Sequence, residues 1–381
     1  MSDSTEKTPL VQDCLKLGFG MMRLPHLGKG TMYDPIDVEQ TKKMVDSFIE
    51  AGGKYFDTAF VYNGSEEATR KALCDRYPRD AYYLASKLNA SAFACGNEKE
   101  AKAELRTSLQ RTGCGYFDFY LLHGLGEENL HLYDDYGLWE YVRELKKNGL
   151  VKHIGFSFHD KPELLDRILT EHPEAEFVQL QINYSDWEDA SIQSKKCYET
   201  AVKHGKPVIV MEPVKGGLLA NPPEQVKKIL QDAAPESSPA SWAVRFAASL
   251  DHVMIVLSGM SNEAQMADNL SFMKDFRPLS ESEMTVVENA RVALLKTDRI
   301  PCTACHYCTA GCPVKMHIPE IFAVMNVYKM YGNIDRAKSD YGWRAGTTKA
   351  SACVRCGQCE KACPQHLPII RLLKETADTL E

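Results

Sequence analysis

The sequence predicts an α/β fold: a closed barrel of eight parallel strands surrounded by helices, followed by a smaller, mainly helical domain. The first observation is that short apolar runs alternate with amphipathic segments up to about residue 278. The second is that eight of the thirteen cysteines fall in two copies of one spacing near the C-terminus. The alternation alone leaves a doubly wound open sheet as the other choice.

Eight apolar runs are expected as strands, because the strands of a parallel sheet are buried on both faces and are rich in β-branched and aromatic residues. Eight strands, each followed by a helix over roughly 250 residues, match the arithmetic of a TIM barrel. The expected strands are 15–20, 54–58, 82–87, 117–123, 151–157, 177–181, 207–212 and 253–258.

The segments between these runs have the apolar spacing of helices, and several end at glycine, which commonly stops a helix. A further helix near 281–296 is expected to lead the chain out of the barrel. The expected barrel helices are 38–51, 65–77, 99–112, 138–148, 162–171, 191–204, 239–250 and 262–270.

Both cysteine groups have the spacing C-x2-C-x2-C-x3-C followed by proline, which is typical of bacterial proteins with two [4Fe–4S] clusters. In such proteins the fourth cysteine of each run ligates the other cluster. A zinc site usually uses pairs of cysteines, and a disulfide framework suits small secreted domains. The expected ligand sets are Cys302, Cys305, Cys308 and Cys363 for one cluster, and Cys353, Cys356, Cys359 and Cys312 for the other.

The two cysteine runs start 51 residues apart, and an apolar segment with helical spacing, 319–331, lies between them. We therefore expect a small, mainly helical, ferredoxin-like iron–sulfur domain. The expected domains are the barrel at 1–278, a connecting helix at 279–300 and the iron–sulfur domain at 301–381.

The composition is that of an ordinary soluble protein, with 44% hydrophobic and 25% charged residues. A net charge of −7 gives no electrostatic case for nucleic acid. No apolar run reaches the roughly 18 residues of a membrane-spanning helix, and the segment MSDSTEKTPL lacks the apolar core of a signal peptide. We therefore expect a cytoplasmic protein of a reducing, low-oxygen cell.

Three ionisable residues stand at the C-terminal ends of neighbouring expected strands, where barrel active sites lie. Asp57 comes at the end of the second strand, Lys87 of the third and His123 of the fourth, and Tyr62 lies in the loop after the second. Each residue alone is commonly a salt-bridge, packing or hydrogen-bonding residue. All four in this order favour a single catalytic group.

These residue types suit the reduction of a carbonyl group or an activated alkene. Hydride arriving at carbon leaves charge on a carbonyl oxygen, so an acid must supply a proton. A free tyrosine has a pKa near 10, and a nearby lysine ammonium lowers it. An aspartate keeps that lysine charged, and a histidine can hold the carbonyl oxygen. We therefore expect Tyr62 to be the general acid, assisted by the other three.

The barrel region resembles the aldo-keto reductase superfamily in stretches that span it in order. With its cysteine runs, the chain is similar to the branch that carries a C-terminal [4Fe–4S] ferredoxin domain. The resemblance implies an oxidoreductase whose catalytic tetrad is Asp57, Tyr62, Lys87 and His123. The matching stretches are LGFGMMRLP (17–25), YFDTAFVYNGSEEA (55–68), LASKL (84–88), DFYLLHG (118–124), KHIGFSF (152–158) and LSGMSNEAQMADNL (257–270).

The resemblance also implies a nicotinamide cofactor, NAD(P)H. Its phosphates would bind at the glycine-containing loops after the seventh and eighth strands, as is common in such barrels. Ser157 and Gln179 would hold the nicotinamide carboxamide. The implied cofactor contacts are Gly20, Ser157, Gln179, Lys215, Gly216, Gly259, Ser261, Gln265 and Asn269.

The chain departs from the family pattern at several of these contacts. Gly259 and Gln265 stand where many members place basic residues that grip a 2′-phosphate. Met211 replaces an aromatic residue that stacks on nicotinamide, and Phe158 replaces an asparagine. These departures weaken the case for NADP over NAD and for a standard nicotinamide site.

Three interpretations stay open, because nicotinamide transfers two electrons as hydride whereas each cluster transfers one. In the first, a nicotinamide-dependent reductase carries structural or redox-sensing clusters. In the second, the clusters feed electrons to a flavin or to the substrate, with a redox partner protein such as ferredoxin. In the third, the barrel is the scaffold of an electron-transfer subunit. The small-molecule substrate stays unidentified; loops 26–33, 125–136 and 184–189 are expected to shape its pocket.

Overall fold

The computed structural model of the 381-residue chain describes residues 10–28, 34–190 and 192–381. Part of the expected substrate loop 26–33, the expected helix start at 191 and most of the segment MSDSTEKTPL lie outside these ranges. Contacts divide the chain into two compact units. The first unit comprises residues 1–188, 192–215 and 240–280, and the second comprises 189–191, 216–239 and 281–381.

The first unit is built on a closed barrel of eight parallel strands, which pair in chain order and close from β8 to β1. The predicted (β/α)8 fold is confirmed, and every observed strand overlaps its predicted run. The strands are β1 (Leu17–Gly20), β2 (Tyr55–Asp57), β3 (Tyr83–Leu88), β4 (Phe117–Leu125), β5 (Val151–Phe158), β6 (Phe177–Gln181), β7 (Val208–Met211) and β8 (Val253–Ser258).

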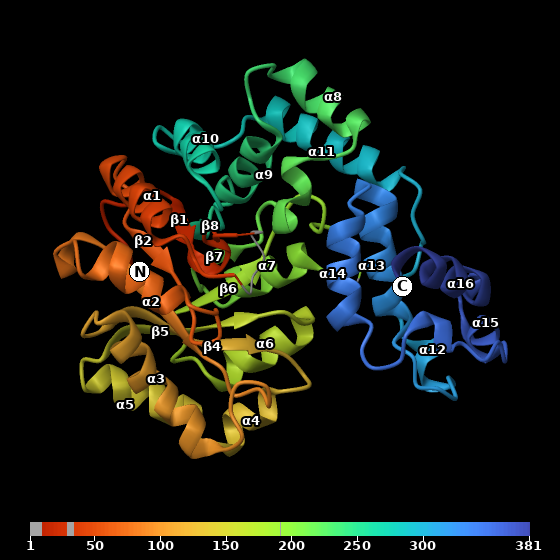
Figure 1. The fold of residues 1–381 in the computed structure, drawn as a ribbon, viewed down its shortest axis with the longest axis horizontal. Coiled ribbons are helices and arrows are strands. Elements are labelled where there is room, and N and C mark those ends of the chain that lie inside the picture. The colour runs from red at the N-terminus through yellow and green to blue at the C-terminus, as the bar shows by residue number, and fades with distance from the viewer. Residues whose placement is uncertain (1–9, 29–33, 191) are drawn as a thin grey trace, which may run out of the picture. The chain divides into compact units, whose positions relative to one another are not determined.

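Helices surround this barrel (Figure 1). The helix expected at 65–77 is α-helical only as far as Thr69 and continues as a π-helical turn, η2 (Arg70–Cys74). Helix α4 was not predicted. The α-helices of the first unit are α1 (Val38–Glu50), α2 (Ser65–Thr69), α3 (Glu98–Thr112), α4 (Leu130–Asp135), α5 (Leu138–Lys147), α6 (Pro162–Glu171), α7 (Ser194–Lys203), α9 (Pro239–Ala248) and α10 (Glu263–Met273).

Alternation of side chains along the strands decides which residues face the barrel interior. Residues two apart on a strand face the same side. Asp57, Lys87 and Gln179 each lie two residues beyond a member of one buried apolar cluster, so they face the interior nearer the C-terminal strand ends. That cluster consists of Tyr55, Ala85, Phe119, Leu121, Phe177, Ile209, Ile255 and Leu257.

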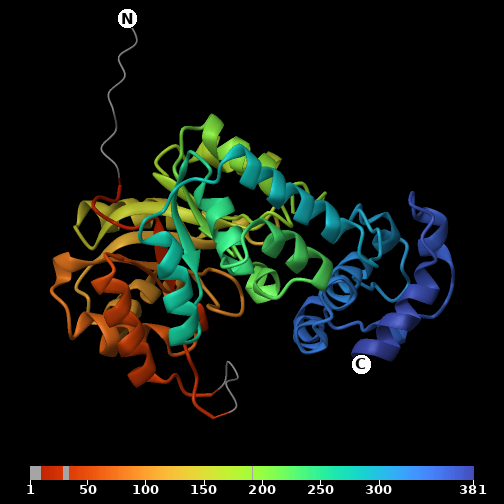
Figure 2. The ribbon, with the colours of Figure 1, turned by 90° about the horizontal axis from the view of Figure 1, so that it is seen from above.

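The second unit is helical. The described part of residues 301–381 contains helices and no strand, which confirms the predicted mainly helical domain. Figure 2 shows its blue helices packed as one group. The helices of the unit are α8 (Glu224–Ala233), α11 (Glu281–Leu295), α12 (Tyr307–Ala310), α13 (Ile318–Tyr331), α14 (Ile334–Arg344), α15 (Gln358–Ala362) and α16 (Ile369–Leu380).

Helix α8 packs against α11, and Gln225 Nε2 donates a hydrogen bond to Ala293 O over 3.3 Å. Helices α8, α12, α14, α15 and α16 were not predicted. The domain boundaries expected at 278 and 300 stay a prediction, since contacts also group residues 216–239 with the second unit. No helix in the described parts of the chain is both long and apolar enough to span a bilayer.

Candidate active site and cluster pockets

Lys87 and Asp57 form an ion pair near the C-terminal strand ends of the barrel interior. Lys87 Nζ donates to Asp57 Oδ1 over 2.6 Å and to the backbone oxygen of Thr58 over 2.7 Å. The side chains are 0% and 5% exposed, so water screens the pair very little. Strands β2 and β3 hold both residues rigidly.

Tyr62 and His123 complete a group of four side chains. Lys87 Nζ lies 4.8 Å from the centroid of the Tyr62 ring. The rings of Tyr62 and His123 stand edge to face, with centroids 5.7 Å apart and planes at 81°. A hydrogen bond of 3.0 Å from Tyr62 N to Ala59 O closes the turn after β2. The structure therefore brings together all four residues that the sequence placed in one group.

Burial raises the pKa of Tyr62 above its usual range, and the Lys87 ammonium acts in the opposite direction. The sequence analysis led us to expect that Lys87 lowers this pKa. Lys87 does act in that direction, but burial outweighs it. The raised pKa keeps the phenol protonated near neutral pH, which is the state that a proton donor needs.

The other three pKa values follow from burial and from the same ion pair. Burial disfavours the Lys87 ammonium, but the charges of Asp57 and Tyr62 outweigh burial and raise the pKa of Lys87. Burial raises the pKa of Asp57 against the opposing effect of Lys87. Burial, and then the Lys87 charge, lower the pKa of His123 well below its usual range, so its imidazole is neutral. Its buried Nδ1 has no partner among the described residues.

Two side chains that were expected to hold a nicotinamide carboxamide have partners inside the protein. Gln179 Nε2 donates to Asp57 Oδ2 over 3.2 Å, and Gly124 N donates to Ser157 Oγ over 2.7 Å. Both side chains are buried. Gln179 therefore helps to position the Asp57 carboxylate, a role that the sequence did not suggest.

The loop after β8 leads into α10 and carries the expected adenosine contacts. Asn262 caps the helix by accepting from Gln265 N over 2.9 Å. Gln265 Oε1 accepts from Ser261 N over 2.7 Å, and Gln265 O accepts from Asn269 Nδ2 over 3.0 Å. Asn269 Oδ1 is buried without a partner among the described residues. Such an acceptor would be satisfied by the amino group of an adenine, so the loop fits a dinucleotide.

Gly20 and Gly259 also lie at this loop. A Cβ at Gly20 would be 3.4 Å from Ser258 O, and a Cβ at Gly259 would be 3.4 Å from Cδ of Arg23. Arg23 was missed by the sequence analysis. It lies in a short 3-10 turn, η1 (Met21–Arg23), directly after β1. A basic side chain is therefore present beside the loop in which Gly259 and Gln265 carry no charge.

The loop after β7 holds Lys215 in an ion pair with Asp186. Asp186 is buried and also accepts from Gln181 Nε2 over 3.0 Å and from Asn183 Nδ2 over 2.8 Å. Lys215 and Gly216 have positive φ angles of 50° and 63°. The charge of Lys215 is therefore already compensated inside the protein.

Glu212, directly after β7, is a second residue that the sequence analysis missed. Its φ of 54° is uncommon for a residue other than glycine, and such conformations gather at functional sites. Its charge is among the causes that raise the pKa of Tyr62. The signal available in the sequence was a carboxylate placed at the C-terminal end of a barrel strand.

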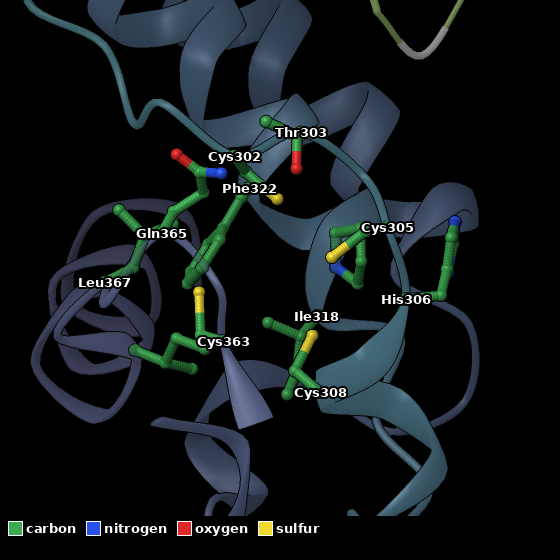
Figure 3. Close-up of a pocket in the computed structure, with 12 residues that line it drawn as sticks. Cys302, Thr303, Cys305, His306, Cys308, Ile318, Phe322, Cys363, Gln365 and Leu367 are labelled. Atoms are coloured by element: carbon green, nitrogen blue, oxygen red, sulfur yellow. The ribbon is translucent and has the colours of Figure 1, made fainter. Parts of the chain in front are cut away.

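Four cysteines from both runs line one pocket of the second unit, which we call the first pocket. Figure 3 shows their sulfur atoms facing a common space between apolar side chains that include Phe322 and Leu367. The four cysteines are Cys302, Cys305, Cys308 and Cys363.

A second pocket has the complementary composition: three cysteines of the second run and the fourth of the first. Neither pocket is lined by a carboxylate. Four soft thiolate donors without oxygen ligands suit an iron–sulfur cluster. Within the described residues, no three His, Cys, Asp or Glu side chains group closely enough to hold a single metal ion. The four cysteines of the second pocket are Cys312, Cys353, Cys356 and Cys359.

The two cysteine runs repeat one backbone conformation. Positive φ angles occur at three pairs of positions, each pair 51 residues apart like the runs themselves. Turns of this kind direct successive N–H groups into one concavity, as at many anion and Fe–S sites. Both loops are therefore shaped for an anionic cluster. The pairs are Ala304 (51°) with Arg355 (57°), His306 (59°) with Gly357 (75°), and Lys315 (50°) with His366 (51°).

Comparison with known families assigns the protein to the oxidoreductases. The profile of the aldo/keto reductase family matches residues 16–291, and that of a 4Fe-4S dicluster domain matches residues 301–367. The chain therefore belongs to the aldo/keto reductase family and carries a C-terminal 4Fe-4S dicluster domain. The resemblance found in the sequence is confirmed.

The chain is 30% identical over 210 residues to the aldo-keto reductase str7 of Strobilurus tenacellus, covering 54% of this chain and 59% of that protein. It is 27% identical over 232 residues to the NAD(P)H-dependent 6′-deoxychalcone synthase of Glycine max, covering 56% and 70%. The holo form of the aldo-keto reductase AKR11C1 from Bacillus halodurans superposes with a TM-score of 0.59 at 24% identity, covering 74% of this chain and 95% of that one. The structural likeness shows the fold.

Proposed function

We propose that this enzyme reduces a carbonyl group, or an activated alkene, of a small molecule, with Tyr62 as the proton donor. The observation that carries the proposal is the position of Lys87. Its ammonium is bonded to Asp57 and lies 4.8 Å from the centroid of the Tyr62 ring. A fixed, buried cation stabilises the phenolate that forms when a neighbouring phenol gives up its proton. The ammonium therefore makes proton transfer from Tyr62 to the substrate easier.

Each of the four side chains has one role in this proposal. The neutral His123 holds the substrate oxygen by a hydrogen bond, and Tyr62 donates its proton to that oxygen. Lys87 stabilises the phenolate that remains, and water screens its ammonium little because the Lys87 side chain is fully buried. Asp57 balances the lysine charge and fixes its position. Gln179 in turn holds the Asp57 carboxylate.

The proposal includes NAD(P)H as the cofactor, which supplies hydride when bound. The support from this chain is the unpaired Asn269 Oδ1 on α10, while two backbone amides at the start of that helix, Ser261 N and Gln265 N, already donate to side chains of the same loop. The NAD(P)H dependence in the name of the Glycine max relative points the same way.

We also propose that the eight cysteines hold two [4Fe–4S] clusters in the crossed sets of the two pockets. Cys305 and Cys356 are exposed, one at each pocket. Exposed thiolate ligands are open to oxidation, so we propose that the enzyme works in the reducing cytoplasm of a low-oxygen cell.

A second candidate function sends electrons from the clusters to a flavin or directly to the substrate, with the same tetrad supplying protons. Met211 and Phe158 replace residues of the usual nicotinamide site, and Gln179 bonds to Asp57. These observations favour the second candidate. The visible spectrum of anaerobically purified protein distinguishes the two, because a bound flavin absorbs at wavelengths that nicotinamide does not.

The test of the first candidate is Tyr62→Phe, assayed on a substrate found by screening carbonyl compounds and activated alkenes under anaerobic conditions. Only one hydroxyl is lost, so fold and nicotinamide affinity should stay, while kcat/KM should fall by about 10²–10⁴. Tyr328→Phe, on the partly exposed face of α13, is the matched control. Near-normal turnover by Tyr62→Phe would exclude the tetrad from the mechanism. It would favour the third interpretation, in which the barrel is the scaffold of an electron-transfer subunit.

A further inference from the structure

Four basic residues line the second pocket or lie within two residues of its lining residues, and we call them the basic collar: Lys315, Arg355, Lys361 and Arg371. Arg355 lines the pocket, and Lys315 lies between two residues that line it. Arg371 follows Ile370, another lining residue, and Lys361 is on α15 two residues after Cys359. All four are exposed.

The charges of the basic collar are not compensated within the described parts of the chain. None of the four forms an ion pair there, whereas Lys374 on the same helix as Arg371 pairs with Asp378. The nearest carboxylate in sequence is Glu360, and its Oε1 accepts from the backbone N of Ile370 over 2.9 Å. The surface at the second pocket is therefore basic.

The first cysteine run carries no such charges, although the two runs share one backbone conformation; Lys361 and Arg371 also lie two residues from Cys363 and Ile369 of the first pocket. Residues 301–312 contain no Lys, Arg, Asp or Glu. His306 of this run has a carboxylate beside it, because Glu320 Oε1 lies 3.7 Å from His306 Nε2. The asymmetry in charge therefore comes from the sequence and not from the fold of the cysteine loops.

The second pocket also offers a path for electrons at the surface. Cys356 is exposed, and Val354, between two of the pocket's cysteines, is 58% exposed. An exposed thiolate ligand brings a cluster close to the surface, and an exposed apolar side chain inside a charged rim is the usual composition of a transient protein contact.

We propose that the basic collar docks an acidic one-electron carrier protein, which exchanges electrons with the cluster of the second pocket. In this step one electron leaves the reduced centre of the carrier and enters the cluster, and no bond forms or breaks. The inference rests on the proposed ligand sets and does not depend on how hydride reaches the barrel. Complementary charge steers such encounters and speeds association by about 10–10³-fold, an effect that salt removes.

The test uses the full chain with its iron, under anaerobic conditions, and an acidic bacterial-type ferredoxin as the reductant. Stopped-flow absorbance gives the second-order rate constant of cluster reduction at several salt concentrations. The variant Lys361→Glu/Arg371→Glu reverses two charges of the basic collar. Lys338→Glu/Arg344→Glu, on exposed positions of α14, makes the same change of charge at residues that line neither pocket.

The proposal expects the collar variant to lose at least about tenfold in rate at low salt and to lose most of its salt dependence, whereas the α14 variant stays near wild type. Reduction by dithionite and the iron and sulfide content should be unchanged.

Equal losses in both variants would overturn the proposal, as would clusters that dithionite reduces and ferredoxin does not. If the collar variant instead dissociates a wild-type dimer in sedimentation, the surface binds a second copy, and the proposal is wrong. Protein without iron or sulfide would overturn the ligand sets themselves.

Discussion

Lys87 donates to Asp57 inside the barrel over 2.6 Å, with almost no exposure of either side chain. Removing one partner of such a buried pair typically costs about 3–5 kcal/mol, because the other charge is left without compensation. The pair therefore contributes to the stability of the barrel and also places a positive charge beside Tyr62.

Lys87→Met should lower kcat/KM by a factor comparable to Tyr62→Phe. Without the ammonium, nothing opposes the effect of burial on the pKa of Tyr62, and that pKa rises further. The double variant should lose little more than either single one, because the two residues act as a unit. Asp57→Asn should lower kcat/KM less than Lys87→Met does, provided that Lys87 stays charged without its carboxylate partner. Lys338→Met, exposed on α14, is the control. Losses that multiply in the double variant would show that Lys87 does not act through Tyr62.

Anaerobically purified protein should hold about eight irons and eight sulfides per chain. Cys312→Ser should remove the cluster of the second pocket and largely spare that of the first, because Cys312 lines the second pocket. Cys363→Ser should have the opposite effect. Iron analysis and the electron paramagnetic resonance of the reduced clusters measure the two losses, and Cys197→Ser is a control in a buried thiol away from both pockets. Loss confined to the first pocket in Cys312→Ser would contradict the crossed ligand sets.

NADH and NADPH should bind with affinities that differ by less than about tenfold, or about 1.4 kcal/mol. The reason is that Gly259 and Gln265 carry no charge where a 2′-phosphate would lie. Fluorescence titration gives the two dissociation constants. A larger preference for NADPH would contradict this expectation, and Arg23→Gln would then test whether the side chain beside Gly259 reads the phosphate.

Glu104 should contribute a fall in the free energy of unfolding as pH rises between about 4.5 and about 8, whereas the lowered pKa of His123 acts in the opposite direction below about 6.5. Burial raises the pKa of Glu104 to about 8 from 4.5, against a hydrogen bond from Asn89 N. In this window the folded state binds a proton that the unfolded state does not, so stability decreases by up to about 1.4 kcal/mol per pH unit and levels off above the folded pKa.

Glu104→Gln keeps the shape and removes the titration, so the difference in unfolding free energy between wild type and the variant should shift against wild type as pH rises across that window. Chemical denaturation at pH 5, 7 and 9 gives the comparison (these values bracket the window set by the two pKa values). Glu98→Gln, exposed on the same helix α3, should follow wild type. Parallel pH dependence in Glu104→Gln and wild type would show that the Glu104 carboxyl is not protonated in the fold.

The barrel could be predicted because its strands are continuous apolar runs and its helices end at glycines; β6 and β8 have the predicted bounds. Helix α8 was missed although Val226, Ile229, Leu230 and Ala233 have helical spacing, because only 239–250 was assigned as the helix between the seventh and eighth strands. The predicted helix 65–77 is α-helical only to Thr69, because a π-helical turn begins at Arg70. Nothing in a pattern of apolar residues distinguishes a π turn from an α-helix.

The candidate site was predictable where chemistry depends on position along a strand. Asp57, Lys87 and His123 follow from strand ends alone. The bond from Gln179 to Asp57 depends on the closure of the barrel, which brings β6 near β2 across the interior. The effect of burial on Tyr62 depends on packing and exceeds the charge effect that the sequence suggested. Arg23 was missed because its neighbour is a loop at the other end of the barrel sequence.

In the proposed ligand sets, the crossing of the fourth cysteines would make iron part of the core of the second unit. With the proposed ligand sets, each cluster ties together two loops 51 residues apart, and Cys308, Cys359 and Cys363 belong to the buried core of that unit. Metal loading and folding then form one equilibrium, as in other small metal-dependent domains. In a cell short of iron, or one exposed to oxygen, the barrel would fold while residues 301–381 would stay unfolded. The amount of complete enzyme would then depend on the supply of iron.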